Sequence, residues 1–523
     1  MTQPPLPRRD GAGPATPPQL SAAGFLDLVL DPGTWRSWDT PPVRGITAGP
    51  AGLQRPDEAL APGMGALPGT RVDEALVTGM GELRGMPVAV VAGEFAFRAG
   101  SVGVTAADRL VAAVERATAE RLPLVASPAS GGMRMQEGTA AFVRMVGMAG
   151  AIARHKAARL PYLVYLRHPT TGGVLASWGS LGHVTFAEPG ALIGFTGPRV
   201  YEQISGEPFP AGVQTAENLH AHGLIDGVIA PERFAEVAAR VLAVLGPPAT
   251  GVAERLLPAA TPEPPREVAA WELVTRSRRP ERPGLRFLLD VAAEDVTVLD
   301  GSGWGGADPG LALALARFGE ARCVLIGQDR EAQRSSGPIG PAGLRKARRG
   351  MAIAAELGLP LVTVIDTPGA ALSREAEEGG LAAEIAGCLA SLADQPGPTL
   401  SVLLGEGVGG VAIALLPADR TIAAQHAWLS PLPLEGASAL LHHTVARAPE
   451  VAREQGIRAL DLLRLGVVDQ VVAEHPDAAD EPRAFCRRLG RVIADELGRL
   501  ARHAPTDRAA ARMRRYRDAR PPA

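Results

Sequence analysis

Glycine-bearing turns recur in the same order in the two halves of the chain, and this repeat limits how the chain can fold. In the first half, the apolar run PLVAS leads into SGGMRMQE, and a second run, PYLVYL, leads into PTTGGVLAS. In the second half, PLVTVID leads into TPGAA, and TLSVLL leads into GEGVGGVAIA. Gly131 precedes Gly172 by 41 positions, and Gly369 precedes Gly409 by 40. Two copies of one strand–glycine turn–helix unit at nearly one spacing predict an internal structural duplication.

The size and composition of the chain favour an α/β fold with two large domains. At 523 residues the chain is too long for one ordinary hydrophobic core. Apolar residues make up 46% of it and aromatic residues only 4%, which suits close-packed layers of helices on sheets. Each short apolar run followed by an apolar helical pattern then predicts a buried strand leading into a covering helix.

Proline-rich stretches mark the predicted domain boundaries. MTQPPLPRRDGAGPATPPQL contains too much Pro and Gly to pack, and GPPATGVAERLLPAATPEPPR divides the chain almost in half. The Arg-rich end predicts a helical tail that faces solvent or a partner. The predicted segments are a disordered arm over 1–20, a first domain over 21–245, a linker over 246–269, a second domain over 270–503 and a basic tail over 504–523.

Charge, lysine content and cysteine content exclude several classes of protein. A net charge of -3 gives no global attraction for nucleic acid or an acidic membrane, and no window approaches about 18 consecutive apolar residues. Lys156 and Lys346 are the only lysines, which leaves few candidates for a catalytic or biotinylated lysine. Cys323, Cys388 and Cys486 fit neither a disulfide framework nor a zinc pair. We predict a soluble cytoplasmic protein that binds neither nucleic acid nor membrane and holds no metal.

A glycine turn between a buried strand and a helix has a structural and a chemical interpretation. Tight turns and close packing need glycine, but successive N–H groups at a helix N-terminus can also stabilise a developing oxyanion. Four such turns on two matching scaffolds favour the chemical interpretation for at least one pair. The sequence contains no GxSxG, GxxxxGK[ST] or HExxH motif, and GEGVGG lacks the later acidic residue of a dinucleotide site. Catalysis is therefore predicted to depend on backbone amides and positioning.

Several segments resemble the carboxyltransferase of bacterial acetyl-CoA carboxylase. In the first half, FRAGSVG, SGGMRMQEG, PTTGGVLAS and AEPGALIGFTGPRVYEQ resemble its β subunit, in the family order. From Ala270 onward, AWELVTRSRRPERP, GPIGPAGLRKARRGMAIAAELGLPLVTVIDTPGA, GEGVGGVAIA and LEGAS resemble its α subunit. The two resemblances together cover the chain from about Phe25 to about Leu500.

The resemblance implies a fold, a reaction and a set of partners. It implies two crotonase-like domains in tandem, each a spiral of ββα units. The active site would lie between the β-type domain of one protomer and the α-type domain of its partner, which implies a homodimer or a larger oligomer.

The reaction that the resemblance implies moves a carboxyl group from carboxybiotin to acetyl-CoA, giving malonyl-CoA. Carboxybiotin releases CO2, its ureido nitrogen takes the α-proton, and the enolate attacks CO2. Biotin would be attached to a separate biotin carboxyl carrier protein, served by a biotin carboxylase.

The same resemblance implies roles for individual residues, because both the thioester enolate and the ureido oxygen of biotin need stabilising. The implied residues are Gly131 and Gly132 for the thioester oxyanion, Gly410 and Val411 for the biotin oxyanion, Gly100, Ser101, Gly172, Gly173 and Ile413 for acyl-CoA binding, and Gly369, Ala370 and Gly409 for biotin binding.

Three departures from the family pattern keep alternatives open. The chain has no cysteine before Cys323, so the family's four-cysteine zinc module is absent and zinc is not predicted. GEGVGG is one residue shorter than the family's usual GEGGSGG, and ALSREAEEGGL replaces the usual tract after PGA. The alternatives are carboxylation of propionyl-CoA or another acyl-CoA, the carboxyltransferase of a malonate decarboxylase, and a non-catalytic assembly or regulatory subunit.

Overall fold

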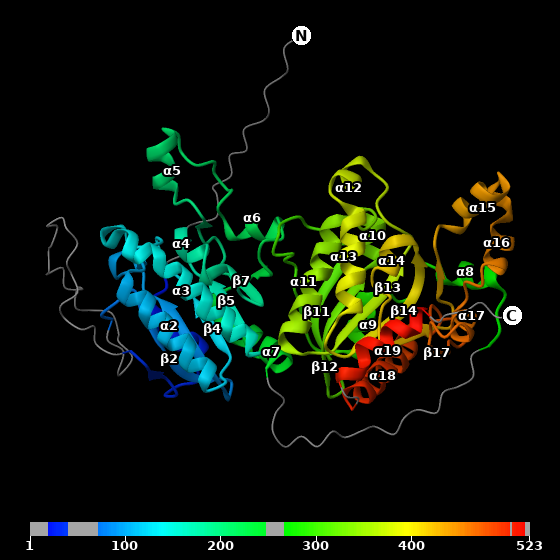
Figure 1. Ribbon diagram of the computed structural model, residues 1–523, viewed down its shortest axis with the longest axis horizontal. Coiled ribbons are helices and arrows are strands. Elements are labelled where there is room, and N and C mark those ends of the chain that lie inside the picture. The colour runs from blue at the N-terminus through cyan, green and yellow to red at the C-terminus, as the bar shows by residue number, and fades with distance from the viewer. Residues whose placement is uncertain (1–18, 40–71, 247–265, 503–504, 518–523) are drawn as a thin grey trace, which may run out of the picture. The chain divides into compact units, whose positions relative to one another are not determined.

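The computed structural model describes residues 19–39, 72–246, 266–502 and 505–517, and these form two compact units (Figure 1). The first unit comprises the described residues up to Ala221 together with Gly227–Glu236. The second comprises His222–Asp226 and the described residues from Val237 onward. The predicted arm over 1–20 and linker over 246–269 lie largely outside the described residues.

The first unit is built on a mixed sheet of seven strands. In hydrogen-bonding order the strands are β1 (Arg36–Ser37), β2 (Leu76–Leu83), β3 (Met86–Gly93), β4 (Leu124–Ser127), β5 (Tyr162–Leu166), β7 (Val184–Ala187) and β9 (Gly227–Val228). Strands β1 to β3 pair antiparallel, and the pairs from β3 to β9 are parallel. A separate parallel pair joins β6 (Thr170–Thr171) to β8 (Ile193–Gly194).

The described helices of this unit are α1 (Ala22–Val29), α2 (Val104–Ala119), α3 (Gly138–Ala157), α4 (Gly172–Leu175), α5 (Pro198–Ser205), α6 (Ala216–Ala221) and the beginning of α7 (Pro231–Leu245). Helices α2 and α3 pack against each other. An aromatic cluster fixes α1 and α7 to the sheet, because the ring of Tyr165 lies 5.8 Å from that of Phe25 and 4.5 Å from that of Phe234.

The second unit repeats the strand order of the first. In hydrogen-bonding order its strands are β10 (Glu294–Val298), β11 (Leu311–Phe318), β12 (Ala321–Gln328), β13 (Leu361–Thr367), β14 (Thr399–Val408), β15 (Arg420–Ala424) and β17 (Gln470–Val472), and β16 (Trp428–Ser430) also pairs with β14. Strands β10 to β12 pair antiparallel and the rest parallel. The duplication predicted from the glycine spacing is thus seen as two sheets that share one order and one pattern of direction.

Helices cover both faces of the second sheet. The described helices are α8 (Ala270–Ser277), α9 (Leu285–Ala292), α10 (Arg330–Ser336), α11 (Pro341–Leu357), α12 (Arg374–Glu378), α13 (Leu381–Ala393), α14 (Gly409–Ile413), α15 (Leu434–His442), α16 (Ala448–Glu454), α17 (Ala459–Arg464), α18 (Pro482–Ala501) and α19 (Pro505–Arg517). In β12, Ile326 lies under Gly350 of α11, whereas its neighbour Gly327 lies under Leu285 of α9. Successive strand residues point to opposite faces, so α9 and α11 lie on opposite sides of the sheet.

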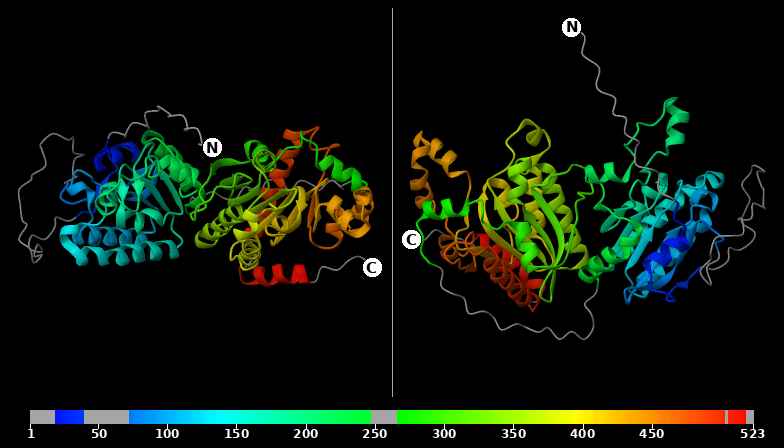
Figure 2. Two further views of the ribbon diagram at one scale, coloured as in Figure 1. Left: turned by 90° about the horizontal axis from the view of Figure 1, so that it is seen from above. Right: turned by 180° about the vertical axis from the view of Figure 1, so that it is seen from behind.

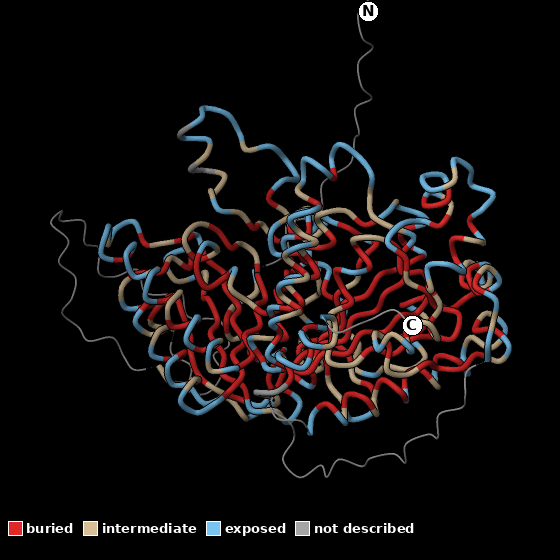
Figure 3. Tube along the Cα trace, turned by 45° about the vertical axis from the view of Figure 1, so that its right-hand side comes forward, coloured by how far each residue is buried: buried red, intermediate tan, exposed pale blue. Residues whose placement is uncertain are grey.

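The central strands form the core of each unit, and buried residues are drawn in red in Figure 3. All seven residues of β13 and all ten of β14 are buried. Strands that read as continuous apolar runs are typical of parallel sheets covered on both faces. The predicted α/β class is confirmed. Within the described ranges, none of the helices combines the length and the apolar character needed to cross a bilayer.

The basic end of the chain is not simply a solvated helix. Arg512 of α19 is only 1% exposed, and its guanidinium contacts Asp419 and the backbone oxygens of Leu392, Ala393 and Gln395, where α13 ends. Figure 2 shows α18 and α19, at the red end of the colour scale, from two further directions. The tail was expected to face solvent or a partner because its sequence is Arg-rich, but the helix C-terminus and Asp419 provide acceptors for a buried arginine.

Candidate active site

The first predicted turn follows β4 and is held by the hydroxyl of Ser130. Ser130 Oγ accepts a hydrogen bond from the N–H of Gly132 at 3.0 Å and donates one to the backbone oxygen of Gly100 at 2.5 Å. The N–H of Gly131 donates to the backbone oxygen of Ala99 at 2.9 Å. Gly132 has a φ of 111°, which favours glycine. The structure therefore brings the predicted Gly100 loop against the Gly131–Gly132 turn, and the N–H groups of this turn are engaged within it.

The second predicted turn, at Gly172 and Gly173, touches the first. A Cβ placed on Gly172 would lie 3.1 Å from the Cα of Gly132, so only glycine allows the two turns to approach this closely. The Gly172 N–H donates to the backbone oxygen of Phe195 at 2.9 Å. The N–H groups of Gly173 and Val174 open helix α4, and no acceptor for either occurs in the described part of the chain. This helix N-terminus is a backbone donor site beside the Gly131–Gly132 turn.

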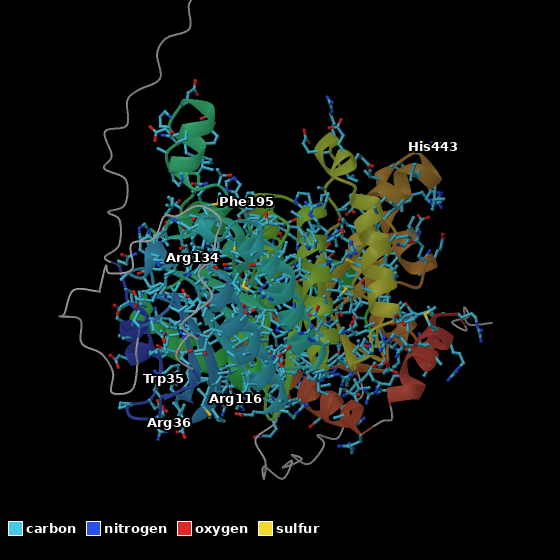
Figure 4. All side chains as sticks on the ribbon, turned by 60° about the vertical axis from the view of Figure 1, so that its left-hand side comes forward. Trp35, Arg36, Arg116, Arg134, Phe195 and His443 are labelled. Atoms are coloured by element: carbon cyan, nitrogen blue, oxygen red, sulfur yellow. The ribbon has the colours of Figure 1, made fainter. Side chains whose placement is uncertain are left out.

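A buried arginine holds the loop that contains Gly100 and Ser101. Arg134, labelled in Figure 4, pairs with Glu74 and lies 2.9 Å from Glu137, and it also donates to the backbone oxygen of Ser101 at 2.8 Å. Glu137 in turn accepts from the N–H of Val104 at the start of α2, at 2.6 Å. Sequence reasoning did not assign a role to Arg134, although it stands within the SGGMRMQE segment.

The second unit contains the same pair of turns. At the end of β13, the hydroxyl of Thr367 accepts from the N–H of Gly369 at 3.2 Å, as Ser130 does from Gly132, and Gly369 has a φ of 135°. Ala370, next in the chain, forms a parallel bridge with Ile339. Gly132 is therefore the counterpart of Gly369, and each precedes its second turn, at Gly172 or Gly409, by 40 positions. The matching pairs are therefore Gly132 with Gly172 and Gly369 with Gly409, whereas Gly131, from which the spacing of 41 was counted, lies one residue earlier in the turn.

The last predicted turn joins β14 to α14. Gly409 has a φ of 71°, close to the 65° of Gly172. The N–H groups of Gly410 and Val411 open the helix, and among the described residues neither donates to an acceptor. A Cβ on Gly410 would meet Ile385 of α13 at 2.8 Å, so this turn also lies in tight packing. Ile413, at the end of α14, is 40% exposed.

Buried charges lie directly behind the turns of the second unit. The carboxylate of Asp366, one residue before Thr367, accepts from the N–H of Glu406 at 3.2 Å and lies 3.5 Å from Arg330. Burial raises the pKa of Asp366 above its ordinary value, although Arg330 and Arg282 act against the rise. Glu406 pairs with Arg278 at 3.2 Å. These charges fix the ends of β13 and β14, from which the two turns emerge.

One group of described residues has the composition of a metal site, namely His426, Glu474 and Asp477. The guanidinium of Arg282 already occupies it, with Nη1 and Nη2 donating to the two carboxylate oxygens of Glu474 at 2.7 and 2.8 Å. Burial would raise the pKa of Glu474, but Arg282 and His426 hold it far below the usual range. A cation beside a buried guanidinium would be repelled, so the group is explained as an ion-pair network.

Comparison with known proteins defines the family. Residues 58–505 match the carboxyl transferase domain. The chain is 56% identical over 498 residues to a probable biotin-dependent acyl-coenzyme A carboxylase beta3 subunit of Mycobacterium tuberculosis, covering 94% of this chain and 96% of that protein. It is 35% identical over 518 residues to the acetyl-coenzyme A carboxylase carboxyl transferase subunits beta/alpha of Salinispora arenicola. This match covers 95% of this chain and 90% of that protein.

Solved structures agree on the fold. The transcarboxylase 12S structure with methylmalonyl-coenzyme A bound superimposes with a TM-score of 0.71 at 22% identity, covering 92% of this chain and 90% of that one. The structure of a single-chain, multi-domain long-chain acyl-CoA carboxylase superimposes with a TM-score of 0.65 at 19% identity. The superposition covers 90% of this chain and 46% of that one. The chain belongs to the carboxyl transferase family. Within that family it is a biotin-dependent acyl-CoA carboxyltransferase.

Proposed function

We propose that the chain transfers a carboxyl group from carboxybiotin, attached to a separate carrier protein, to acetyl-CoA to give malonyl-CoA. The observation that carries this proposal is the pair of matching sites, one in each unit, at which a left-handed glycine starts a helix with open N–H groups. Two oxyanions, one on each reactant, require two such donor sites.

On the acyl-CoA side, the thioester oxygen would bind where the Gly131–Gly132 turn meets Gly172. Because the N–H groups of Gly131 and Gly132 already have acceptors, we assign the donor role to the N–H of Gly173. Gly132 then shapes the turn through its φ of 111°, and Gly172 allows the two turns to approach closely. Gly100 and Ser101 would line the entrance, which Arg134 holds in place.

On the biotin side, the ureido oxygen would accept from the N–H groups of Gly410 and Val411, with Gly369, Ala370 and Gly409 shaping the pocket. Carboxybiotin would supply the carboxyl group and, through its ureido nitrogen, the base. The fit rests on open backbone donors in tight packing, which suit a neutral oxygen that gains negative charge. The apolar Ile413 would border the acyl group, where an apolar residue is compatible with a short acyl chain.

The proposed reaction, in which biotin is attached to a separate protein, implies the partners of this chain. We infer a biotin carboxyl carrier protein and a biotin carboxylase as partners, in the cytoplasm. We also infer a homodimer or larger homo-oligomer, because α3 exposes apolar side chains. Among them are Phe142 at 63% and Val146 at 77% exposure. Apolar side chains four positions apart lie on one face of a helix, and an exposed apolar face is typical of interaction sites.

The test is carboxyl transfer by the purified chain with carboxylated carrier protein and a series of acyl-CoA substrates. We expect turnover with acetyl-CoA at a higher kcat/KM than with propionyl-CoA or a long-chain acyl-CoA. The reverse reaction, from malonyl-CoA to free biotin, should proceed as well. Preference for another acyl-CoA would overturn the substrate assignment. Transfer from malonate held on an acyl-carrier protein, or no transfer at all, would overturn the proposed reaction.

A further inference from the structure

A buried glutamine connects the two turns of the second unit. Gln328 is the last residue of β12 and is 0% exposed. Its side-chain oxygen accepts from the N–H of Asp366 at 3.0 Å, just before the Thr367–Gly369 turn. Its side-chain nitrogen donates to the backbone oxygen of Val411 at 2.8 Å, within the first turn of α14. One planar amide therefore spans both turns.

Both contacts of Gln328 satisfy backbone groups that the secondary structure leaves unpaired. The ladder between β12 and β13 has its last pair at Gly327 and Val364, so the N–H of Asp366 lies beyond it. At the end of α14, the N–H of Ala414 donates to the oxygen of Gly410, and the N–H of Leu415 donates to the oxygen of Ala412. The oxygen of Val411, between them, therefore receives no backbone hydrogen bond from the described residues. An N–H group needs an acceptor and a carbonyl needs a donor, so the orientation of the amide is fixed by its partners.

The fold itself does not demand this residue. Gln328 pairs with Leu311 across the β11–β12 hairpin, and in the first unit Gly93 pairs with Leu76 at the same place in the β2–β3 hairpin. A Cβ on Gly93 would lie 2.5 Å from the backbone nitrogen of Ala129, so no side chain fits there. The same strand order therefore forms with no side-chain bridge at this position, and the bridge is a property of the second unit alone.

We propose that Gln328 is a positioning residue for carboxyl transfer, which sets the N–H groups of Gly410 and Val411 against the Thr367–Gly369 turn. This inference rests on the proposed function, in which α14 holds the ureido oxygen of biotin. Displacement of reacting groups by about 1 Å can cost on the order of 10²-fold in rate. The contribution of Gln328 should thus be found in the transfer step and not in the affinity for acyl-CoA.

The decisive variant is Gln328→Glu, compared with wild type over a range of pH. A protonated glutamic acid copies the amide, because its O–H donates to Val411 and its C=O accepts from Asp366, whereas the carboxylate cannot donate. We expect kcat to fall by about 10²-fold at pH 8 and to recover toward wild type as the pH falls, with KM for acyl-CoA unchanged. Asp366, Arg330, Arg282 and Glu406 are the charged groups around this site and are the same in both proteins, so the ratio of the two rates isolates the new carboxyl group.

Three further variants separate positioning from stability. Gln328→Met, which can neither donate nor accept, should lose kcat equally at every pH. Gln395 is a matched control, because it is a buried glutamine of the same unit whose side chain donates to the oxygen of Met351 at 3.2 Å, away from both turns. Gln395→Glu and Gln395→Met should lower the melting temperature as the Gln328 variants do, while kcat stays within twofold of wild type.

The outcomes are distinct. The inference is overturned if both Gln328 variants keep wild-type kcat, if neither folds, or if Gln328→Glu shows no recovery at low pH. Absence of transfer by the wild-type chain would instead overturn the proposed function. Recovery of Gln328→Glu at low pH, with none for Gln328→Met, supports the positioning role.

Discussion

Four glycines of the candidate site have φ between 65° and 135°, a range that residues with a Cβ rarely adopt. They are Gly132, Gly172, Gly369 and Gly409. At these four positions the backbone, and not a side chain, sets the geometry of the candidate site. A change at such a residue acts through conformational strain even where space is available.

We predict that Gly132→Ala lowers the free energy of unfolding by about 1–3 kcal/mol and reduces carboxyl transfer. The Cβ itself would have room, since its nearest neighbour is the Cα of Gly172 at 3.5 Å, so the effect would come from the φ of 111°. Urea unfolding and the transfer assay measure the two effects. Gly147→Ala in the middle of α3 is the control, and it should gain about 0.5–1 kcal/mol because alanine favours the helix. Equal stability of the two variants would contradict the strain argument.

The buried pair of Glu474 and Arg282 makes stability depend on pH. The folded state holds the pKa of Glu474 below its ordinary value of about 4.3, so its contribution is full above that pH and is lost as the pH falls through the folded pKa. We predict that Glu474→Gln, which leaves Arg282 buried without its carboxylate, costs about 3–5 kcal/mol at pH 7. The difference from wild type should shrink as the pH is lowered below 4.3. A difference that is constant from pH 7 to pH 3 in urea unfolding would show that the pair is not ionised.

At the scale of elements, α19 tests whether the end of the chain belongs to the second unit. Arg512 is buried against Asp419 and the end of α13, whereas Arg514 on the same helix is exposed. We predict that Arg512→Ala lowers the free energy of unfolding by about 3–5 kcal/mol, because Asp419 loses its buried partner. Arg514→Ala should change it by no more than about 0.5 kcal/mol. Loss of equal size in both variants would contradict the docking of this helix.

The elements that the sequence predicted are those with strong local patterns. The runs PLVAS, PYLVYL, PLVTVID and TLSVLL fall on β4, β5, β13 and β14, because parallel strands buried on both faces are apolar throughout. The glycines between strand and helix were predicted because their conformation is local. The sequence did not predict the roles of Gln328, Arg134 and Arg512, because each contacts residues more than 30 positions away. In a sequence, a polar residue that the fold buries cannot be distinguished from an exposed one.

At the scale of the whole molecule, the exposed apolar residues of α3 should govern assembly. We predict that Val146→Asp shifts the protein from an oligomer toward a smaller species, as measured by analytical ultracentrifugation, because a charge would be buried at the interface. Arg154→Ser on the same helix removes a side chain that is 63% exposed and should leave the mass unchanged. A monomeric wild type, or an unchanged mass for Val146→Asp, would overturn the proposed oligomer.

The open N–H groups of Gly173, Gly410 and Val411 belong to the main chain, and no substitution at these positions except proline removes an N–H. An inhibitor that binds through them would therefore leave the protein few routes to resistance. A substitution could only crowd the turn, as a Cβ on Gly410 would against Ile385, and the same crowding would obstruct the enzyme's own substrate. Escape from the inhibitor and retention of carboxyl transfer would then conflict at the same residues.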